Sequence, residues 1–366
     1  MNEQVIEVMN WSQKSNRLTS SMYKDDVVCC AELPLDWSRL DGHTILISGA
    51  TGQIGVALID VLMQRNRNQG GFDCHIIAVG RNEAKARARL PYFQDRHFSF
   101  LESDISQSIE AVTTEADTVI HLASTTHPKA YATNPVGTIA TNVIGLRNLL
   151  EGMRSGERHD GRFLFASSVE VYGRNRGDVL RFKEDYCGYI DPNTLRAGYP
   201  ESKRVGESLC QAYLAQYGVD VVIPRIPRTY GPTLLPSDTK ALSQFLHRGL
   251  DLEDIVLKSE GNQLFSYLYV MDTVSGLLYC LANGDSGAAY NIADADSDIT
   301  LRDLARQIAD LSGTDVVFEL PDVVERRGYS TAITAVMDGD KLKGLGWKPR
   351  YTIREGVART LRMMRS

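Results

Sequence analysis

Two residues four positions apart, Tyr199 and Lys203, could carry proton-transfer chemistry. Residues at this spacing share one face of a helix, so the Lys203 ammonium can lie beside the Tyr199 phenol. A free phenol has a pKa of about 10, and a neighbouring cation lowers it, which makes the phenolate a usable base near neutrality. The spacing alone is more often found on a solvated helix face, so its interpretation depends on the segments that come before it.

A glycine-rich segment, Gly49-x-x-Gly52-x-x-Gly55, lies well upstream. It directly follows an apolar segment, residues 43–48, which predicts a buried parallel strand, and it opens a helix predicted over residues 56–64. Glycine allows a tight turn and close approach of a pyrophosphate, whose charge the helix N-terminus stabilises. The spacing differs by one residue from the common dinucleotide fingerprint, and a plain strand-to-helix turn is the alternative. The context favours a dinucleotide-binding turn.

The end of the second predicted strand, residues 75–79, bears on the choice of cofactor. An acid there accepts hydrogen bonds from the ribose 2′-hydroxyl of NAD, whereas a nearby Arg suits the 2′-phosphate of NADP. Here the strand is followed by Gly80 and Arg81, with no acid. These residues permit NADP, but Arg81 could equally stack on the adenine of NAD.

The elements that must position these residues alternate between strand and helix. Further strands are predicted over residues 118–122, 162–166 and 219–223, with a helix over 138–153 between two of them. This order predicts the α/β class, with a Rossmann-type doubly wound parallel sheet and a smaller C-terminal α/β substrate-binding domain. We expect residues 1–40 to be a partly ordered extension packed on the main body. The domains are expected to be 41–223, an NAD-binding Rossmann domain to which 264–290 return, and 224–366, mainly substrate-binding with helices over 301–311 and 353–363.

Composition excludes several classes of protein. The 366 residues are 43% hydrophobic and 23% charged with a formal net charge of −6, which is typical of a soluble globular protein and argues against a general nucleic-acid-binding surface. No apolar segment approaches the about 18 residues that span a membrane, and the N-terminus has no signal pattern. The six cysteines show no metal-ligand spacing and are interpreted as reduced thiols of a cytoplasmic protein. We expect no metal site.

Taken together, the motifs resemble the extended short-chain dehydrogenase/reductase family that acts on nucleotide sugars, and within it the UDP-glucuronate decarboxylases. The resemblance runs from about residue 43 to the C-terminus. Besides Tyr199 and Lys203, it rests on His121-Leu122-Ala123-Ser124, Thr141-Asn142, Ser167-Ser168-Val169-Glu170-Val171-Tyr172-Gly173, Arg225-Ile226 and Thr229-Tyr230-Gly231-Pro232.

The resemblance implies catalytic roles. Tyr199 would take the proton of the sugar C4 hydroxyl as hydride passes to the nicotinamide, and Lys203 would lower its pKa and hold the nicotinamide ribose. Ser168 would hydrogen-bond the same hydroxyl. Glu170 matches a glutamate shared with dTDP-glucose 4,6-dehydratases, although a surface carboxylate is the alternative. Those dehydratases carry an acidic Asp where this chain has Val169, so decarboxylation or epimerisation fits better than dehydration.

The resemblance also implies NAD as cofactor, with NADP possible, and a homodimer built on helices 138–153 and 199–217, although their apolar stripes would equally serve core packing. The residues implied to contact the cofactor are Gly49, Thr51, Gly52, Gln53, Ile54, Gly55, Arg81, Asp104, Ile105, Leu122, Ala123, Ser124, Asn142, Tyr199, Lys203 and Ile226.

The substrate side is where the chain departs from its family. The implied substrate-binding residues are Tyr131, Arg196, Arg228, Lys240 and Phe265. Relatives carry Asn at position 228, Arg near 240, and a diphosphate-binding Arg at 265. Lysine and phenylalanine do not replace a bidentate guanidinium. Either Arg228 supplies the lost charge and the nucleotide lies differently, or the substrate is not an ordinary UDP-sugar, or the changes are neutral.

Other functions stay open at this level. An NADP-dependent reductase of a keto-sugar or other carbonyl is favoured by Gly80 and Arg81, and a nucleotide-sugar 4,6-dehydratase is a further alternative. A catalytically silent scaffold is disfavoured by the intact set of Ser168, Tyr199 and Lys203.

Overall fold

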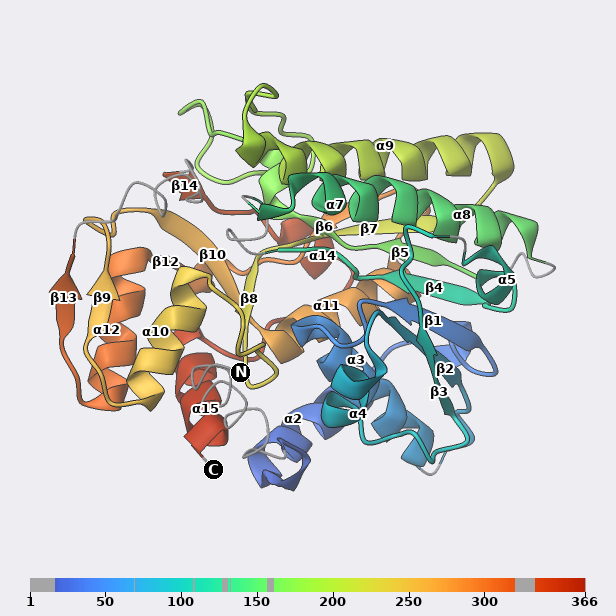
Figure 1. Ribbon diagram of the computed structural model, residues 1–366, viewed down its shortest axis with the longest axis horizontal. Coiled ribbons are helices and arrows are strands. Elements are labelled where there is room, and N and C mark those ends of the chain that lie inside the picture. The colour runs from blue at the N-terminus through green and yellow to red at the C-terminus, as the bar shows by residue number, and fades with distance from the viewer. Residues whose placement is uncertain are drawn as a thin grey trace.

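A computed structural model describes residues 17–365, apart from positions 69, 108, 127–130, 132, 157–160 and 320–332 (Figure 1). Its larger sheet has the strand order β11-β7-β5-β4-β1-β2-β3, with β6 also paired to β7. Every one of these pairings is parallel. The strands are β1 (Thr44–Ser48), β2 (His75–Gly80), β3 (Phe98–Glu102), β4 (Thr118–His121), β5 (Phe163–Phe165), β6 (Ser167–Ser168), β7 (Val221–Ile226) and β11 (Ala289–Asn291).

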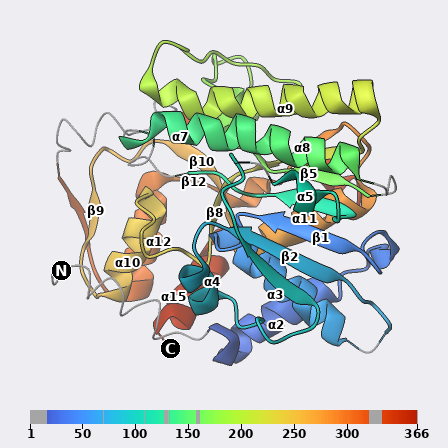
Figure 2. The ribbon, with the colours of Figure 1, turned by 45° about the vertical axis from the view of Figure 1, so that its right-hand side comes forward.

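Helices cover both faces of this sheet. One face carries α7, α8 and α9, and the other carries α3 and α11, as Figures 1 and 2 show from two directions. Both faces of the central strands are therefore shielded, which is why Ile45, Leu46 and Ile47 are apolar and fully buried without alternation. The predicted fold class, a Rossmann-type doubly wound sheet, is confirmed. These helices are α3 (Gln53–Arg67), α7 (Pro135–Ala140), α8 (Leu146–Ser155), α9 (Gly198–Tyr217) and α11 (Val270–Asn283).

The helix predicted over 138–153 is interrupted. Between α7 and α8, Thr141–Gly145 form a π-helical turn. A π turn holds more residues than an α turn, so it shifts the faces of the helix that follows. The shift accommodates Asn142, whose side chain is fully buried.

Strand β3 was not predicted from the sequence. Its Phe98-Ser99-Phe100-Leu101-Glu102 pattern is only partly buried, as fits the edge of the sheet. The missed strand and the π turn are therefore differences from the expected order of elements.

A smaller part, at the left of Figure 1, is made of short strands and helices. Strand β10 pairs antiparallel with β12 and parallel with β14 and β8, while β13 pairs with β9. The domain boundaries given in the sequence analysis stay a prediction. The elements are β8 (Arg228–Tyr230), β9 (Ile255–Leu257), β10 (Leu264–Tyr269), β12 (Asp298–Thr300), β13 (Val316–Phe318), β14 (Thr334–Ala335), α10 (Ala241–Leu250), α12 (Leu301–Ser312) and α15 (Ile353–Arg365). Other short helices are α4 (Glu83–Arg89), α5 (Glu110–Thr113), α14 (Asp340–Lys343) and the 3₁₀ turn η4 (Val169–Tyr172).

The N-terminal segment contains a helix that the sequence pattern did not predict, α2 (Ser21–Ala31). Residues 1–16 of the expected extension lie outside the described residues. Two buried carboxylates fasten this segment. Asp60 of α3 accepts hydrogen bonds from Arg17, Tyr23 and Tyr92. Asp26 of α2 accepts from Tyr269, Tyr351 and Arg359. The helix therefore joins α3 of the larger sheet to α15 of the smaller part.

Candidate active site

A cavity of about 400 Å³ lies where the carboxyl ends of the parallel strands face the smaller part. In doubly wound folds, ligands bind at this edge of the sheet. Its lining includes Gly49 after β1, Leu122 after β4, Ser168 of β6 and Ile226 of β7. Other predicted site residues in the lining are Gly52, Gln53, Ile54, Gly55, Ser124, Tyr131, Glu170, Arg196, Tyr199, Lys203, Arg228, Lys240 and Phe265. The predicted residues that lie outside it are Thr51, Arg81, Asp104, Ile105, Ala123 and Asn142.

The glycine turn has the geometry that a dinucleotide requires. Gly49 has φ +74°, and a Cβ there would lie 2.7 Å from the backbone nitrogen of Ala123. Gly52 is the N-cap residue of α3, so the first backbone N–H groups of this helix point out of the turn. Such donors and the positive end of the helix dipole suit a pyrophosphate. The residues present fit a nicotinamide dinucleotide.

Tyr199 lies near the start of α9 with 7% of its surface exposed. Burial raises the pKa of its phenol, the charge of Glu170 raises it further, and a hydrogen bond from Ser168 and the charge of Arg196 lower it. The neighbours that favour its ionised form are therefore Ser168 and Arg196.

Lys203 lies one helical turn further along α9 and is also buried. Its ammonium donates a hydrogen bond to the carbonyl oxygen of Ala166 at 2.7 Å and lies 4.7 Å from the centre of the Phe165 ring. Burial lowers the pKa of Lys203 to about 7, against the opposing effect of Cys210 and Glu207.

Glu170 is partly buried and ion-paired. Its carboxylate accepts a hydrogen bond from Arg196 at 2.6 Å, and the Arg196 guanidinium lies 4.8 Å from the centre of the Tyr131 ring. The rings of Tyr131 and Tyr199 are 5.1 Å apart. The acid, the guanidinium and the two phenols therefore form one contiguous group around the candidate base.

Two of the three residues at which the sequence departs from the family pattern, Arg228 and Phe265, are in contact. Strands β8 and β10 run side by side, with Arg228 opposite Tyr267. The Arg228 guanidinium carbon lies 3.4 Å from the centre of the Phe265 ring. Burial lowers the pKa of Arg228, while the charges of Tyr267 and Glu170 raise it and that of Arg196 lowers it. Its Nη1 is buried with no hydrogen-bond partner among the described residues. A guanidinium contributed by the neighbouring strand therefore lies over the Phe265 ring.

Lys240, at the N-terminus of α10, differs from Arg228 because its charge is paired. Its ammonium pairs with the carboxylate of Asp238 at 3.0 Å. Both residues line the cavity, so this wall presents a paired rather than a free charge.

A chain of hydrogen bonds holds the start of α9 in place. Ser124 donates to Asn142 at 2.7 Å, Asn142 donates to Ser202 at 2.8 Å, and Ser202 donates to the carbonyl oxygen of Tyr199 at 2.8 Å. Ser202 was not predicted as a site residue. Its signal would have been a small polar residue on the buried face of the helix, between Tyr199 and Lys203.

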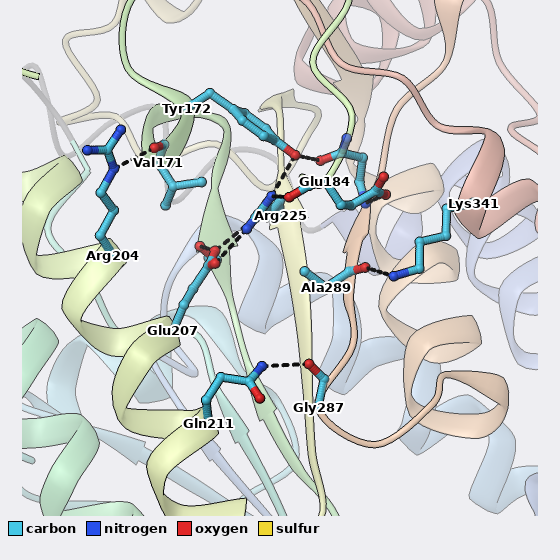
Figure 3. A network of polar contacts seen from close by, with 12 residues as sticks. Val171, Tyr172, Glu184, Arg204, Glu207, Gln211, Arg225, Gly287, Ala289 and Lys341 are labelled. Carbon is cyan, nitrogen blue, oxygen red and sulfur yellow. Dashed lines mark hydrogen bonds and ion pairs between the residues drawn. The ribbon is translucent and has the colours of Figure 1, made fainter. Parts of the chain in front are cut away.

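Behind the cavity, a second network fixes α9 to the sheet (Figure 3). Glu207 of α9 receives two hydrogen bonds from Arg225 of β7, at 2.9 and 2.7 Å. Arg225 also donates to the hydroxyl of Tyr172, which in turn donates to Asn291 of β11. Glu207 is one turn beyond Lys203, so this network holds that turn of α9 against β7.

The smaller part supplies cavity residues that no sequence motif indicated. They come from loops and from α10, β9 and β10, where short elements give little periodic signal. The lining residues of this group include Asp238, Gln244, Lys258, Ser259, Gln263 and Tyr267.

The sequence matches a family model. Residues 45–293 match the NAD dependent epimerase/dehydratase family, and the chain belongs to this family. Among similar proteins, the UDP-glucuronic acid decarboxylase 1 of Xenopus tropicalis is 32% identical over 334 residues, covering 90% of this chain and 73% of that protein. The UDP-glucuronic acid decarboxylase 6 of Arabidopsis thaliana is 33% identical over 318 residues, covering 86% of each. The resemblance inferred from the motifs is confirmed, as is NAD as the cofactor of the family.

Solved structures share the fold. The dTDP-glucose 4,6-dehydratase from Streptomyces venezuelae, with NAD bound, superposes with a TM-score of 0.73 at 25% identity, covering 88% of this chain and 97% of that one. The UDP-glucuronic acid 4-epimerase from Bacillus cereus, in complex with UDP-glucuronic acid and NAD, gives 0.74 at 20% identity, covering 88% and 98%. At 20% identity, the likeness to the epimerase shows the fold alone.

Across the described residues, none of the helices combines the length and the apolar character needed to cross a bilayer. The same residues contain no group of His, Cys, Asp and Glu side chains that could hold a metal ion. All six cysteines are free thiols.

Proposed function

We propose that this NAD-dependent enzyme modifies a nucleotide sugar through a transient 4-keto sugar, as a UDP-glucuronic acid decarboxylase or a nucleotide-sugar epimerase does. One observation carries the proposal: Ser168, Tyr199 and Lys203 line the same cavity as the glycine turn. A redox cofactor and a proton-transfer group therefore meet at one place.

The roles follow from the surroundings of each side chain. When bound, NAD supplies an acceptor and donor of hydride. Tyr199 takes the proton of the C4 hydroxyl, and Ser168 holds that hydroxyl and stabilises the phenolate by its hydrogen bond. Arg196 adds positive charge beside the phenolate, and Lys203 holds the nicotinamide ribose. After the reaction, the same phenol returns the proton.

The residues around Tyr199 favour decarboxylation or epimerisation over dehydration. A carboxylate at C5 is β to a C4 ketone, so it leaves as carbon dioxide because the carbanion delocalises into an enolate. This step needs positioning and donors to the enolate oxygen. Arg196 and Arg228 have buried N–H groups without partners among the described residues. Val169, where a dehydratase would need an acid, is 5% exposed and apolar.

Electrostatics supports an anionic substrate. The charge of Arg196 lowers the pKa of Arg228, and among the described residues only Glu170 is ion-paired with either. We assign the substrate diphosphate to the Arg228 side of the cavity, with Tyr131, Lys240 and Phe265 as further contacts. The predicted division into a Rossmann domain and a substrate-binding domain accords with this assignment.

The experiment that tests the function is a product analysis. The purified chain is incubated with UDP-, dTDP-, CDP- and GDP-linked sugars and uronic acids, and the products are examined by mass spectrometry and chromatography. Loss of the mass of carbon dioxide indicates a decarboxylase, which would be a lyase. Loss of the mass of water indicates a dehydratase, and an isomeric product indicates an epimerase. No conversion of any of them contradicts the proposal.

A second candidate function is an NADP-dependent reductase of a keto-sugar or other carbonyl. The observation that favours it is Gly80 followed by Arg81 at the end of β2. Such an enzyme releases oxidised cofactor in each turnover, whereas the enzyme proposed above regenerates it. Stoichiometric oxidation of NADPH by a carbonyl substrate would establish the reductase.

A cytoplasmic homodimer is proposed for the assembly. Apolar side chains stand exposed along α7, the π turn and α9: Val136 is 77% exposed, Ile139 42%, Ile144 49% and Val205 47%. A second copy of these helices would cover them in a four-helix bundle, as the family resemblance implies. A monomer in light scattering at micromolar concentration would contradict this assembly.

A further inference from the structure

His121 opens the segment His121-Leu122-Ala123-Ser124, yet the chemistry proposed above does not use its side chain. It is the last residue of β4 and is completely buried. Its Nδ1 is hydrogen-bonded at 2.7 Å to the hydroxyl of Ser48, the last residue of β1, which is also completely buried. The two residues lie opposite each other in the parallel pairing of β1 with β4. A buried histidine therefore links the carboxyl ends of two central strands.

Two segments that line the cavity begin at this link. Gly49 follows Ser48 and starts the glycine turn, while residues 122–124 follow His121. The backbones touch, because a Cβ on Gly49 would lie 2.7 Å from the backbone nitrogen of Ala123. The carbonyl oxygen and the hydroxyl of Ser48 accept hydrogen bonds from the first two backbone N–H groups of the second segment, at 3.1 and 3.4 Å. A change in the contact between Ser48 and His121 would therefore move one segment against the other.

The imidazole ring is enclosed by the surroundings of the candidate catalytic lysine. It stacks on Phe165, with ring centres 5.8 Å apart and planes 24° apart, and the Lys203 ammonium lies 4.7 Å from the centre of the same Phe165 ring. Burial lowers the pKa of His121, and the charge of Lys203 lowers it further, which favours the neutral imidazole. Its Nε2 has no hydrogen-bond partner among the described residues. Within that part of the chain, the bond to Ser48 is therefore the hydrogen bond that orients the ring.

We propose that His121 is a positioning residue for the cofactor: through Ser48 it sets the spacing of the glycine turn against residues 122–124. Binding sites need their groups held to within about 0.5 Å, and buried hydrogen bonds beside them supply that support. Ser124, the last residue of the segment, also begins the chain of hydrogen bonds that reaches the carbonyl oxygen of Tyr199. This role concerns the cofactor side of the cavity, so it holds whichever sugar the enzyme modifies.

Titration with NAD tests this role without any sugar. The full chain, stripped of copurified nucleotide, is titrated calorimetrically, and each variant is also melted without ligand. Ser48→Ala removes the hydroxyl and should weaken NAD binding by about threefold to tenfold, the range for one lost hydrogen bond. His121→Phe removes the same bond from the other strand, keeps an aromatic ring against Phe165 and should cause a similar loss. Because both variants remove one shared contact, the double variant should bind NAD no more weakly than either alone.

His121→Asn is the conservative variant. The Asn amide places a polar atom where Nδ1 lies, so it can keep the bond to Ser48 although it lacks the rest of the ring. It should retain an NAD affinity within about twofold of the parent, because the hydrogen bond survives. The lost packing against Phe165 should nevertheless lower its melting temperature. The Asn variant should therefore lose stability but not affinity, which a purely structural role of His121 would not give.

A matched control lies at the other end of the same two strands. Nδ1 of His43, just before β1, is 3.3 Å from the hydroxyl of Thr118, the first residue of β4. Thr118 is buried, and neither residue lines the cavity. Thr118→Val should lower the melting temperature but leave the NAD affinity unchanged, because this pair lies away from the segments that receive the cofactor.

Three results would overturn the proposal. They are a Ser48→Ala variant that binds NAD as tightly as the parent, a His121→Asn variant that loses as much affinity as His121→Phe, and a Thr118→Val variant that loses as much as Ser48→Ala. If His121→Phe does not fold, Ser48→Ala takes its place in the comparison with His121→Asn, since it removes the same bond by a smaller change.

Discussion

Replacing Arg228 by Asn, the residue that relatives carry, should separate ligand binding from stability. Stacking of a desolvated guanidinium on an aromatic ring contributes about 2 kcal/mol, and the 3.4 Å contact with Phe265 is of this kind. Leaving a buried donor unpartnered costs about 1–3 kcal/mol, and Nη1 of Arg228 is such a donor. The two effects nearly cancel, so Arg228→Asn should change the melting temperature little.

Binding should respond differently, because a diphosphate gives that donor its partner. A lost charge-assisted hydrogen bond costs about 1.5–3 kcal/mol, or about tenfold to a hundredfold in affinity. The assay is calorimetric titration with UDP and with whichever nucleotide sugar is turned over, beside a thermal melt of each variant. Phe265→Leu is a useful comparison, since it keeps the guanidinium but removes the ring beneath it and should have a smaller effect.

Adding Phe265→Arg to the Arg228→Asn variant should restore part of the affinity from the other strand. An Arg228→Asn variant that binds every substrate as the parent does would show that Arg228 does not hold the phosphates. If no nucleotide sugar binds to the parent, the substrate belongs to another class and only the redox chemistry of the site remains.

Four other changes probe the rest of the structure. Tyr199→Phe should keep cofactor binding but lower turnover by about a hundredfold or more, measured by product formation; turnover within a few-fold of the parent would remove Tyr199 from the mechanism. Lys203→Met should be at least as damaging, and it should also alter stability. Because the pKa of Lys203 is depressed to about 7 in the folded chain, its contribution to stability rises with pH from about 7 to the unfolded value of about 10.4. The Met variant should therefore gain most over the parent at pH 7 and less at pH 9 in urea unfolding, and a gain independent of pH would refute the depressed pKa. Gly52→Asp should abolish cofactor binding in calorimetry, because its carboxylate would face the pyrophosphate; unchanged affinity would contradict the dinucleotide site. Asp26→Ala removes one partner of a buried ion pair and should cost about 3 kcal/mol in unfolding free energy, whereas the exposed neighbour Asp25→Ala should cost little.

The fold class followed from the sequence because its signals are local. A buried strand before the glycine turn and the alternation of apolar strands with helices each occupy a short window. The helix at 301–311 was also predicted, since α12 has a regular apolar stripe and a Thr300 cap. Strand β3 was missed because its edge position leaves it only partly buried, and α2 was missed because its buried face includes Asp26 and Cys30 beside apolar residues.

The candidate site was predicted less completely than the fold. Motifs indicated residues such as Ser168 and Tyr199, and the structure brings them to one cavity. The stack of Arg228 on Phe265 could not be read from the sequence, because it depends on the register of β8 against β10. The π turn that buries Asn142 was not predicted either, because the sequence pattern of residues 138–153 is that of one continuous helix. The roles of the site residues stay predictions until the variants above are measured.

The attachment of α2 has a consequence for how the chain is made. Asp26 finds its partner Arg359 333 residues later in the sequence. Ribosomes add about 5–20 residues per second, and domains fold as their residues emerge. Helix α2 is therefore synthesised among the first described residues, yet its surface around Asp26 must wait uncovered until α15 leaves the ribosome. Nascent chains stalled before that helix should expose this surface to chaperones, and the closing of α2 onto α15 should be among the last events of folding.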